Sequence, residues 1–389
     1  MSLSRDNRLL AFSLFLWGVG DGLSFYIRPL YLKELGADPV AVGSILALVY
    51  LVNGLTHIPA GYLADRFGRK QLLVAGWVLG VLTALLMYLA QTLEMFVIWL
   101  VAYMFTGFVI SPINAYVSEA RGAQSVQRAL TLVSAGFWGG TIFSPAVGGW
   151  IGQTFGLRAV YGVAVVALTL STVALLPLRP QPLTPPAAGS TRYGPLLRNR
   201  RFLGFLGLVF VALGAMQLGI PLLPTFMAEV RRLDVSAIGL LGSVNSLGVV
   251  VLNLTLGQRI PRRGFLIGQG LMALSVVLIL SSGGLGWLGP AYFLQAGWNL
   301  SRGMATAQVG RVVAAQELGL AFGISETVIT ATTVLAPLAA GFLYRQSPTL
   351  PLSLSLGLIA LSLPLVWWLA PRRDAHSAEP AAASVAEAP

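Results

Sequence analysis

Long apolar stretches alternate with short polar segments along the whole chain. Most of these stretches have about the 20 mostly apolar residues that a helix needs to cross the hydrocarbon core of a bilayer. The pattern therefore predicts about twelve transmembrane helices. Their approximate ranges are 9–32, 39–62, 71–90, 94–117, 128–151, 157–177, 202–227, 236–257, 264–282, 287–310, 319–343 and 350–370.

A segment rich in proline and arginine, 178–201, divides these spans into two sets of six. Such a composition is incompatible with a helix in lipid and is typical of a linker. We therefore expect an N-terminal six-helix bundle over 1–177, a cytoplasmic linker over 178–201 and a C-terminal six-helix bundle over 202–371. The alanine-rich, low-complexity tail, 372–389, is predicted to be disordered.

The two halves are similar in sequence at matching places. The segment RLLAF from Arg8 opens the first half, and RFLGF from Arg201 opens the second, 193 positions later. The segment SPAVGG from Ser144 matches APLAAG from Ala336, 192 positions later. The two similar offsets indicate a duplicated six-helix unit. The predicted fold class is all-α and integral to the membrane, with two pseudo-symmetric six-helix bundles.

Composition supports this fold class and excludes several others. Apolar residues make up 56% of the chain and charged residues 10%, whereas soluble proteins have about 25% charged residues. Cysteine is absent, which excludes disulfides and thiolate catalysis, and the two histidines are too few for a typical histidine metal site. The sequence contains no nucleotide-binding loop and no convincing catalytic set, so we predict neither an enzyme nor a cofactor.

The positive charge is distributed unevenly between the two sides of the predicted membrane. If the N-terminus is cytoplasmic, 19 of the 25 basic residues lie inside and 6 outside. This asymmetry predicts that both termini are cytoplasmic. The charges fall between spans without an aromatic-interleaved basic face, so nucleic acid is not an expected partner. The first span lacks an Ala-x-Ala cleavage site and is expected to be retained. The excess of Arg over Lys, 23 to 2, suggests a bacterial cytoplasmic membrane.

The loop between the second and third spans reads GYLADRFGRK from Gly61 to Lys70. It resembles the loop signature G-x-L-a-D-R-x-G-R-[KR] of the major facilitator superfamily. The resemblance implies secondary transport by alternating access, with Asp65 near the start of the eleventh helix, around Gly319, in the outward-open state. A solvated loop that only fixes topology is the alternative. The residues assigned to this conformational switch are Gly61, Asp65, Arg66, Gly68, Arg69, Lys70, Glu119 and Arg121.

The physical properties of the residues in this loop independently support its role in the conformational switch. Its glycines permit a tight turn, and Asp65 at a membrane boundary needs a cation or a helix N-terminus beside it. The corresponding loop in the second half, 257–264, has Pro261 where an acid would fall. The switch is therefore expected to depend mainly on the first loop.

A second motif lies in the fifth predicted helix. It resembles the antiporter signature G-x-x-x-G-P-x-x-G-G of drug exporters, with a serine in place of one glycine. A proline among small residues bends a helix and lets its neighbour approach closely. Ordinary small-residue packing is the alternative. The motif residues are Gly140, Ser144, Pro145, Gly148 and Gly149.

Two acids within predicted spans, Asp21 and Glu326, are the candidates for proton coupling. A charge inside the membrane costs a few kcal/mol on insertion scales, so such residues face a wet cavity or form pairs. Loss of water around a carboxylate favours its protonated form. Asp21 is the first candidate and Glu326 the second. A structural ion pair of Asp21 with Arg28 or Arg302 is the alternative.

Several polar and aromatic residues are candidates for the lining of a substrate cavity. The spacing of Trp17, Asp21, Ser24 and Arg28 places them on one helix face. Each remaining candidate alone is as consistent with an interhelical hydrogen bond. The full set is Trp17, Ser24, Arg28, Asn53, His57, Gln217, Asn245, Gln295, Trp298, Asn299 and Arg302.

These observations favour proton-coupled export of small amphipathic or drug-like compounds. The alternatives are proton-coupled uptake or exchange of a sugar or another polar metabolite, and a lipid-handling carrier. The expected partners are a small-molecule substrate, protons or another ion, and the lipid bilayer. The chain is expected to be a monomer without a metal site.

Overall fold

The computed structural model describes residues 3–122, 124–181, 199–256, 263–281, 284–309, 312–313 and 318–369. Within them, eleven helices are long and apolar enough to cross a membrane. The tenth predicted span is broken at Ala296 into two shorter helices, α14 and α15. The predicted count of about twelve spans is confirmed once this broken span is included. The predicted tail and most of the predicted linker lie outside the described residues.

The helices form two halves in chain order. The first half contains α1 (Arg5–Phe25), α2 (Arg28–Glu34), α3 (Pro39–Phe67), α4 (Arg69–Leu89), α5 (Leu93–Met104), η1 (Phe105–Val109), α6 (Ile110–Glu119), α7 (Val126–Phe155) and α8 (Leu157–Leu175). The second contains α10 (Arg200–Gln217), α11 (Leu223–Glu229), α12 (Val235–Thr255), α13 (Arg263–Ser281), α14 (Leu285–Gln295), α15 (Gly297–Val309), α16 (Leu318–Gln346) and α17 (Leu350–Leu369).

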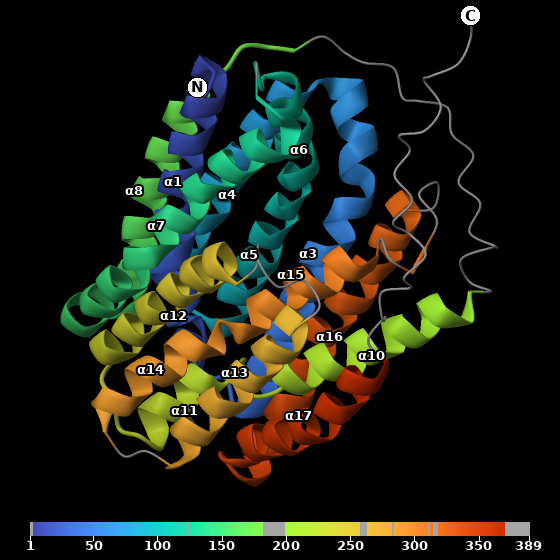
Figure 1. Cartoon of the computed structure of the whole chain (residues 1–389). Coiled ribbons are helices and arrows are strands. Elements are labelled where there is room, and N and C mark those ends of the chain that lie inside the picture. Colours follow the sequence, from blue (N-terminus) through green and yellow to red (C-terminus); the bar gives the residue numbers. More distant parts are fainter. Residues whose placement is uncertain are drawn as a thin grey trace, which may run out of the picture.

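Each half is a helical bundle, and the two bundles meet along two helix pairs (Figure 1). Helix α3 of the first half packs against α16, and α7 packs against α12. Counted as spans, the second meets the eleventh and the fifth meets the eighth. Exchanging the halves converts one pair into the other, so the predicted pseudo-symmetry is confirmed.

Small residues allow these helix pairs to approach closely. A methyl group at Gly43 in α3 would overlap the carbonyl oxygen of Pro337 in α16. In the other pair, a methyl group at Gly239 in α12 would overlap the carbonyl oxygen of Pro145 in α7. Helices in lipid associate through such van der Waals packing, because there is little hydrophobic drive between them. All these contacts lie at the end of the molecule that holds α2 and α11, hereafter the closed end.

The first span of each half is broken near the closed end. Helix α1 ends at Phe25 and α2 begins at Arg28, with Pro29 in its first turn. Helix α10 ends at Gln217 and α11 begins at Leu223, with Pro224 in its first turn. Proline lacks an amide hydrogen and disfavours the helical conformation of the residue before it, so it is well placed at a helix start. The breaks turn side chains toward the boundary between the halves.

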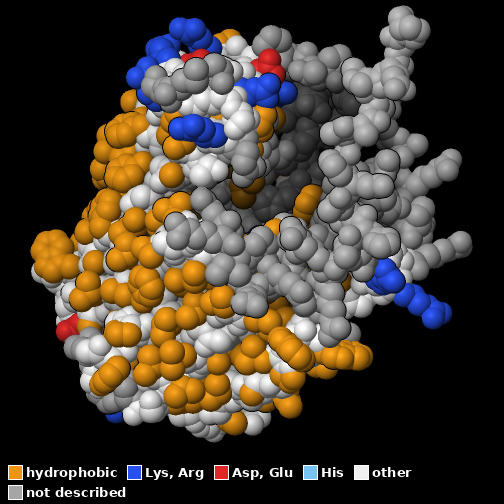
Figure 2. Space-filling view, viewed as in Figure 1, with side chains coloured by type: hydrophobic (Ala, Val, Ile, Leu, Met, Phe, Trp, Pro, Cys, Tyr) orange, Lys and Arg blue, Asp and Glu red, His pale blue; other side chains and the backbone are white. Residues whose placement is uncertain are grey.

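The outer surface is suited to lipid. Large apolar side chains such as Leu361 and Trp367 are more than three-fifths exposed, at 69% and 67%. Figure 2 shows apolar side chains over most of the displayed face, whereas basic side chains gather near the end where α1 begins.

Candidate functional site

The break between α1 and α2 positions Arg28. Its side chain is 7% exposed and reaches back toward Asp21, near the end of α1. The Arg28 Nη2 atom lies 3.6 Å from Asp21 Oδ1. The predicted ion pair of these two residues is thus present. It forms across a chain break rather than along one continuous helix face.

Asp21 has a second partner in Tyr103 of α5. The Tyr103 hydroxyl donates to Asp21 Oδ1 at 3.5 Å, and the carboxylate is 24% exposed. Taking two charges out of water is costly, and their attraction offsets the cost only with good geometry and further hydrogen bonds. Here one oxygen receives both contacts at long distances. Asp21 therefore has one cationic and one hydroxyl partner, both at the limit of hydrogen-bond length.

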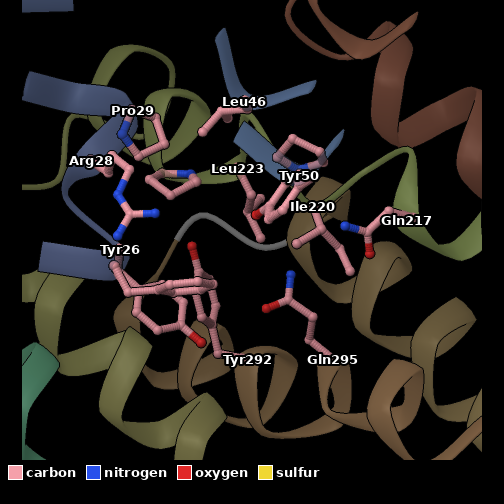
Figure 3. Close-up of a pocket in the computed structure, with 13 residues that line it drawn as sticks. Tyr26, Arg28, Pro29, Leu46, Tyr50, Gln217, Ile220, Leu223, Tyr292 and Gln295 are labelled. Atoms are coloured by element: carbon pink, nitrogen blue, oxygen red, sulfur yellow. The ribbon is translucent and has the colours of Figure 1, made fainter. Parts of the chain in front are cut away.

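A pocket of about 60 Å³ lies beside this pair, where the two halves meet (Figure 3). Its lining is mostly aromatic and apolar, with one cation and two amides. The lining composition is typical of a site for a small organic molecule, whereas the volume is below the roughly 300–1,000 Å³ of drug-sized sites. The lining residues are Phe25, Tyr26, Arg28, Pro29, Leu46, Tyr50, Gln217, Ile220, Pro221, Leu223, Pro224, Tyr292 and Gln295.

A chain of hydrogen bonds connects residues of the pocket wall across the two halves. The Tyr26 hydroxyl donates to Asn245 Oδ1 in α12 at 2.6 Å. Asn245 Nδ2 donates to the Tyr292 carbonyl at 2.8 Å and to Gln295 Oε1 at 3.2 Å. One buried amide therefore connects the end of α1 to α14. The pocket exists only where both halves contribute.

The predicted cavity residues divide into three groups. Arg28, Gln217 and Gln295 line the pocket, and Asn245 lies directly behind it. The other described candidates lie elsewhere, and the side chain of His57 lies outside the described residues. The described candidates that lie elsewhere are Trp17, Ser24, Asn53, Trp298, Asn299 and Arg302.

Three of these candidates pack inside the first half. The Trp17 ring lies 4.8 Å from that of Trp77 and stacks on Tyr103 at 6.2 Å. The Ser24 hydroxyl donates to the carbonyl of Asp21 at 3.3 Å. Asn53 donates to the backbone of α5 at 3.4 Å. Trp17 thus affects the site indirectly, by packing on the tyrosine that contacts Asp21.

The second acid, Glu326 in α16, pairs with Arg302 in α15 at 2.9 Å. The Thr306 hydroxyl donates to the other carboxylate oxygen at 3.4 Å. Both charged side chains are more than two-fifths exposed, at 42% for Glu326 and 45% for Arg302. The predicted alternative pairing of Asp21 with Arg302 is wrong, because Arg302 is paired with Glu326. The better hydration of Glu326 makes Asp21 the stronger candidate for coupling.

The predicted switch loop is described in part. Gly68 separates α3 from α4 with φ of 88°, a conformation that glycine favours, so its predicted role in a turn is confirmed. Arg69 donates to Gln181 Oε1 at 2.9 Å and lies 4.0 Å from Glu119. Lys70 is partly buried and Arg121 is exposed. The structure describes the backbone of Gly61, Asp65 and Arg66 within α3, but not the side chains or surroundings of these residues.

The motif in the fifth predicted helix lies in α7, between α1 and α12. Gly140 and Gly148 face α1, where added methyl groups would overlap backbone carbonyl oxygens. Ser144 also faces α1 and donates to the Gly18 carbonyl at 3.5 Å. Pro145 and Gly149 face α12 instead. The amide of Ala146 donates to Ser243 in α12 at 2.9 Å. The motif therefore packs one helix closely against both its own half and the other.

Sequence reasoning missed the tyrosines of the pocket and an ion pair at the closed end. Tyr26, Tyr50 and Tyr292 were not singled out, because tyrosine is common in membrane helices. The prolines that begin α2 and α11 were the available signal, since they indicated where helices break beside the pocket. Lys33 in α2 pairs with Glu229 in α11, which also accepts from Tyr344 at 2.7 Å.

The family model described as Major Facilitator Superfamily matches residues 10–254 and 205–389. The chain belongs to this superfamily. It is therefore a multi-pass membrane transporter, as the loop signature implied. Two helical bundles with a pocket between them are consistent with this assignment.

Among curated proteins, this superfamily member is similar to several relatives named for drug resistance. It is 23% identical to Multidrug resistance protein 2 of Bacillus subtilis (strain 168), over 92% of this chain and 94% of that protein. It is 26% identical to Multidrug resistance protein 1 of the same organism, over 44% of each. It is 28% identical to the multi-drug resistance efflux pump PmrA of Streptococcus pneumoniae serotype 4, over 40% of this chain and 41% of that one.

Solved structures show the same fold. A mutant of the nucleoside transporter NupG matches with a TM-score of 0.79 at 13% identity, over 94% of this chain and 98% of that chain. The peptide transporter POT in complex with sulfate matches with a TM-score of 0.73 at 18% identity, over 94% of each. At these identities the likeness concerns the fold alone.

Proposed function

We propose that this chain exports small amphipathic compounds in exchange for protons, with Asp21 as the residue that carries the proton. The partly buried Asp21–Arg28 pair beside an aromatic pocket at the junction of the halves is the observation that carries the proposal. Relatives named as multidrug resistance proteins and as an efflux pump support export. The position of the α7 motif at the seam between the halves supports it further.

The distribution of Lys and Arg predicts that the N-terminus is cytoplasmic. In that orientation the closed end, which holds α2 and α11, faces outward. Substrate enters from the cytoplasm and reaches the pocket, where the halves meet. Rocking of the halves then opens the contacts of α3 with α16 and α7 with α12 to the outside.

Asp21 couples this motion to the proton gradient through its partner. When ionised, Asp21 attracts Arg28 and holds the break between α1 and α2 in its present geometry. A proton that arrives from the outside removes this attraction and leaves Arg28 with an unpaired charge. The return to the inward-facing state restores the pair and releases the proton to the cytoplasm. Substrate moves outward while Asp21 carries no proton, and the empty carrier returns with the proton.

Purified protein in liposomes that contain a pH-sensitive dye tests the exporter assignment. A panel of neutral, anionic and cationic drug-like compounds, with sugars as a comparison, is added under an imposed proton gradient. Proton movement triggered by drug-like compounds supports export. A response confined to sugars contradicts it and favours uptake or exchange of polar metabolites.

A further inference from the structure

We propose that the pocket selects substrates by an oxygen acceptor, either a carbonyl or a carboxylate, and disfavours lipophilic cations. Arg28 and Gln295 are the selecting residues. This inference rests on the proposed function, since it names the substrate class of the same pocket. Three properties of the pocket carry it: the fixed orientation of one amide, the spare donors of one guanidinium, and the composition of the lining.

The orientation of the Gln295 amide follows from its neighbours. A backbone carbonyl only accepts hydrogen bonds, so the Asn245 atom that contacts the Tyr292 carbonyl at 2.8 Å is its amide nitrogen. The same nitrogen contacts Gln295 at 3.2 Å, which requires that Gln295 present its oxygen there. The Gln295 NH₂ group is therefore directed away from Asn245. Figure 3 shows it pointing into the pocket as a donor.

Arg28 supplies further donors from the opposite wall. A guanidinium has five N–H donors and no acceptor. Its ion pair with Asp21, at 3.6 Å, is longer than a hydrogen bond. Among the described residues, Arg28 Nε is buried without a hydrogen-bond partner. Because this atom is buried, the donors open to a substrate oxygen are the terminal Nη groups of the guanidinium, which lies beside the pocket in Figure 3. In Figure 3 the guanidinium and the two glutamine amides face the same space.

Among the described residues, the lining contains no acid that could balance a cationic substrate. The charged residue among the lining residues is Arg28. Asp21 pairs with Arg28 and is not among the residues that line the pocket. Tyrosine rings attract cations, but a cation in this pocket would also meet the like charge of Arg28. The donors and the aromatic walls together favour an aromatic molecule with an oxygen acceptor.

Three probes with one ring system and different head groups test this selection. They are 2-acetonaphthone with a neutral carbonyl, 2-naphthoate with a carboxylate, and 2-naphthylmethyl-trimethylammonium with a cation. Binding to the purified full chain is measured by equilibrium dialysis without a proton gradient. Both oxygen-bearing probes are expected to bind at least about ten-fold more tightly than the cation, in line with two hydrogen bonds, one of them charge-assisted. A carbonyl-only or carboxylate-only preference would identify which of the two acceptors the site uses.

Gln295→Glu is the informative variant. Its carboxylate still accepts from Asn245 but offers an oxygen in place of the NH₂ donor. We expect weaker binding of both oxygen-bearing probes, by about ten-fold, and tighter binding of the cation. Gln295→Met removes the donor without adding charge and is expected to weaken the oxygen-bearing probes without any gain for the cation. Gln91→Glu makes the same change at an exposed position outside the pocket and serves as the control.

Binding of both oxygen-bearing probes by the natural chain that is no tighter than binding of the cation would overturn the proposed selection, as would an unchanged order of probes in Gln295→Glu. Because no proton gradient is present, these results are independent of coupling. Selective binding without drug-driven proton flux would contradict the proposed function and leave this inference standing. Drug-driven proton flux together with unselective binding would support the proposed function and overturn this inference.

Discussion

Lys33 of the first half and Glu229 of the second form an ion pair across the closed end. Tyr344 in α16 donates to the same carboxylate at 2.7 Å, so three helices are joined at one acid. These contacts connect the short helices that follow the two broken spans. They stabilise the state in which the closed end is shut, and they must separate when that end opens.

Glu229→Gln should shift the protein toward states in which the closed end is open. The glutamine can still accept from Tyr344, but it loses the attraction of Lys33. Partly exposed ion pairs contribute about 0.2–1 kcal/mol, so the expected shift in the ratio of the two states is at most about five-fold. Because the chain has no cysteine, spin labels on cysteines introduced at Glu34 and Val230 report the distance directly. An unchanged distance distribution would show that the pair does not hold this end shut.

Gly239→Ala should open the same end for a different reason. Its methyl group would overlap the carbonyl oxygen of Pro145, so α7 and α12 must move apart. Overpacking of this kind typically costs about 1–3 kcal/mol. The spin-label distance at the closed end is expected to lengthen, and transport is expected to slow. Gly204→Ala is the matched control, because no atom of a neighbouring described residue lies within 4 Å of the added methyl group. Equal behaviour of the two variants would contradict the role of this close contact.

The overall fold could be predicted from sequence because lipid imposes a simple rule. Backbone polar groups cannot remain unsatisfied in hydrocarbon, so long apolar stretches must be helices. The length of each stretch and the distribution of arginine then predict the spans and their order. The agreement between the segments at Ser144 and Ala336 predicted the duplication. The structure places the corresponding prolines and glycines at the two equivalent contacts between the halves.

The site could be predicted only in part, because its geometry depends on breaks and on pairings between distant helices. The charge of Arg28 in a span was visible in the sequence, and so was its possible pairing with Asp21. Its approach to the pocket depends on the break before Pro29. The link from Tyr26 to Asn245 joins residues 219 positions apart. No local pattern predicts such a contact, since tyrosine and asparagine form many alternative hydrogen bonds.

Glu326→Gln should retain transport driven by a pH gradient. The carboxylate is 42% exposed and its contact with Arg302, at 2.9 Å, can be kept by the glutamine oxygen. Loss of such a hydrated pair is expected to change rates by no more than about two- to three-fold. Drug-driven proton flux in liposomes measures this. Complete loss of coupling in this variant would identify Glu326, rather than Asp21, as the residue that carries the proton.

The most direct test of proton coupling through Asp21 compares two modes of transport in Asp21→Asn. In liposomes, substrate transport driven by a pH gradient requires proton binding, whereas exchange of labelled for unlabelled substrate does not. Asparagine keeps the size of the side chain and can accept from Tyr103, so substrate binding and exchange should persist. Exchange is expected to be retained and pH-driven transport to be lost. Transport in Asp21→Asn that still follows the pH gradient as in the natural chain would contradict this expectation.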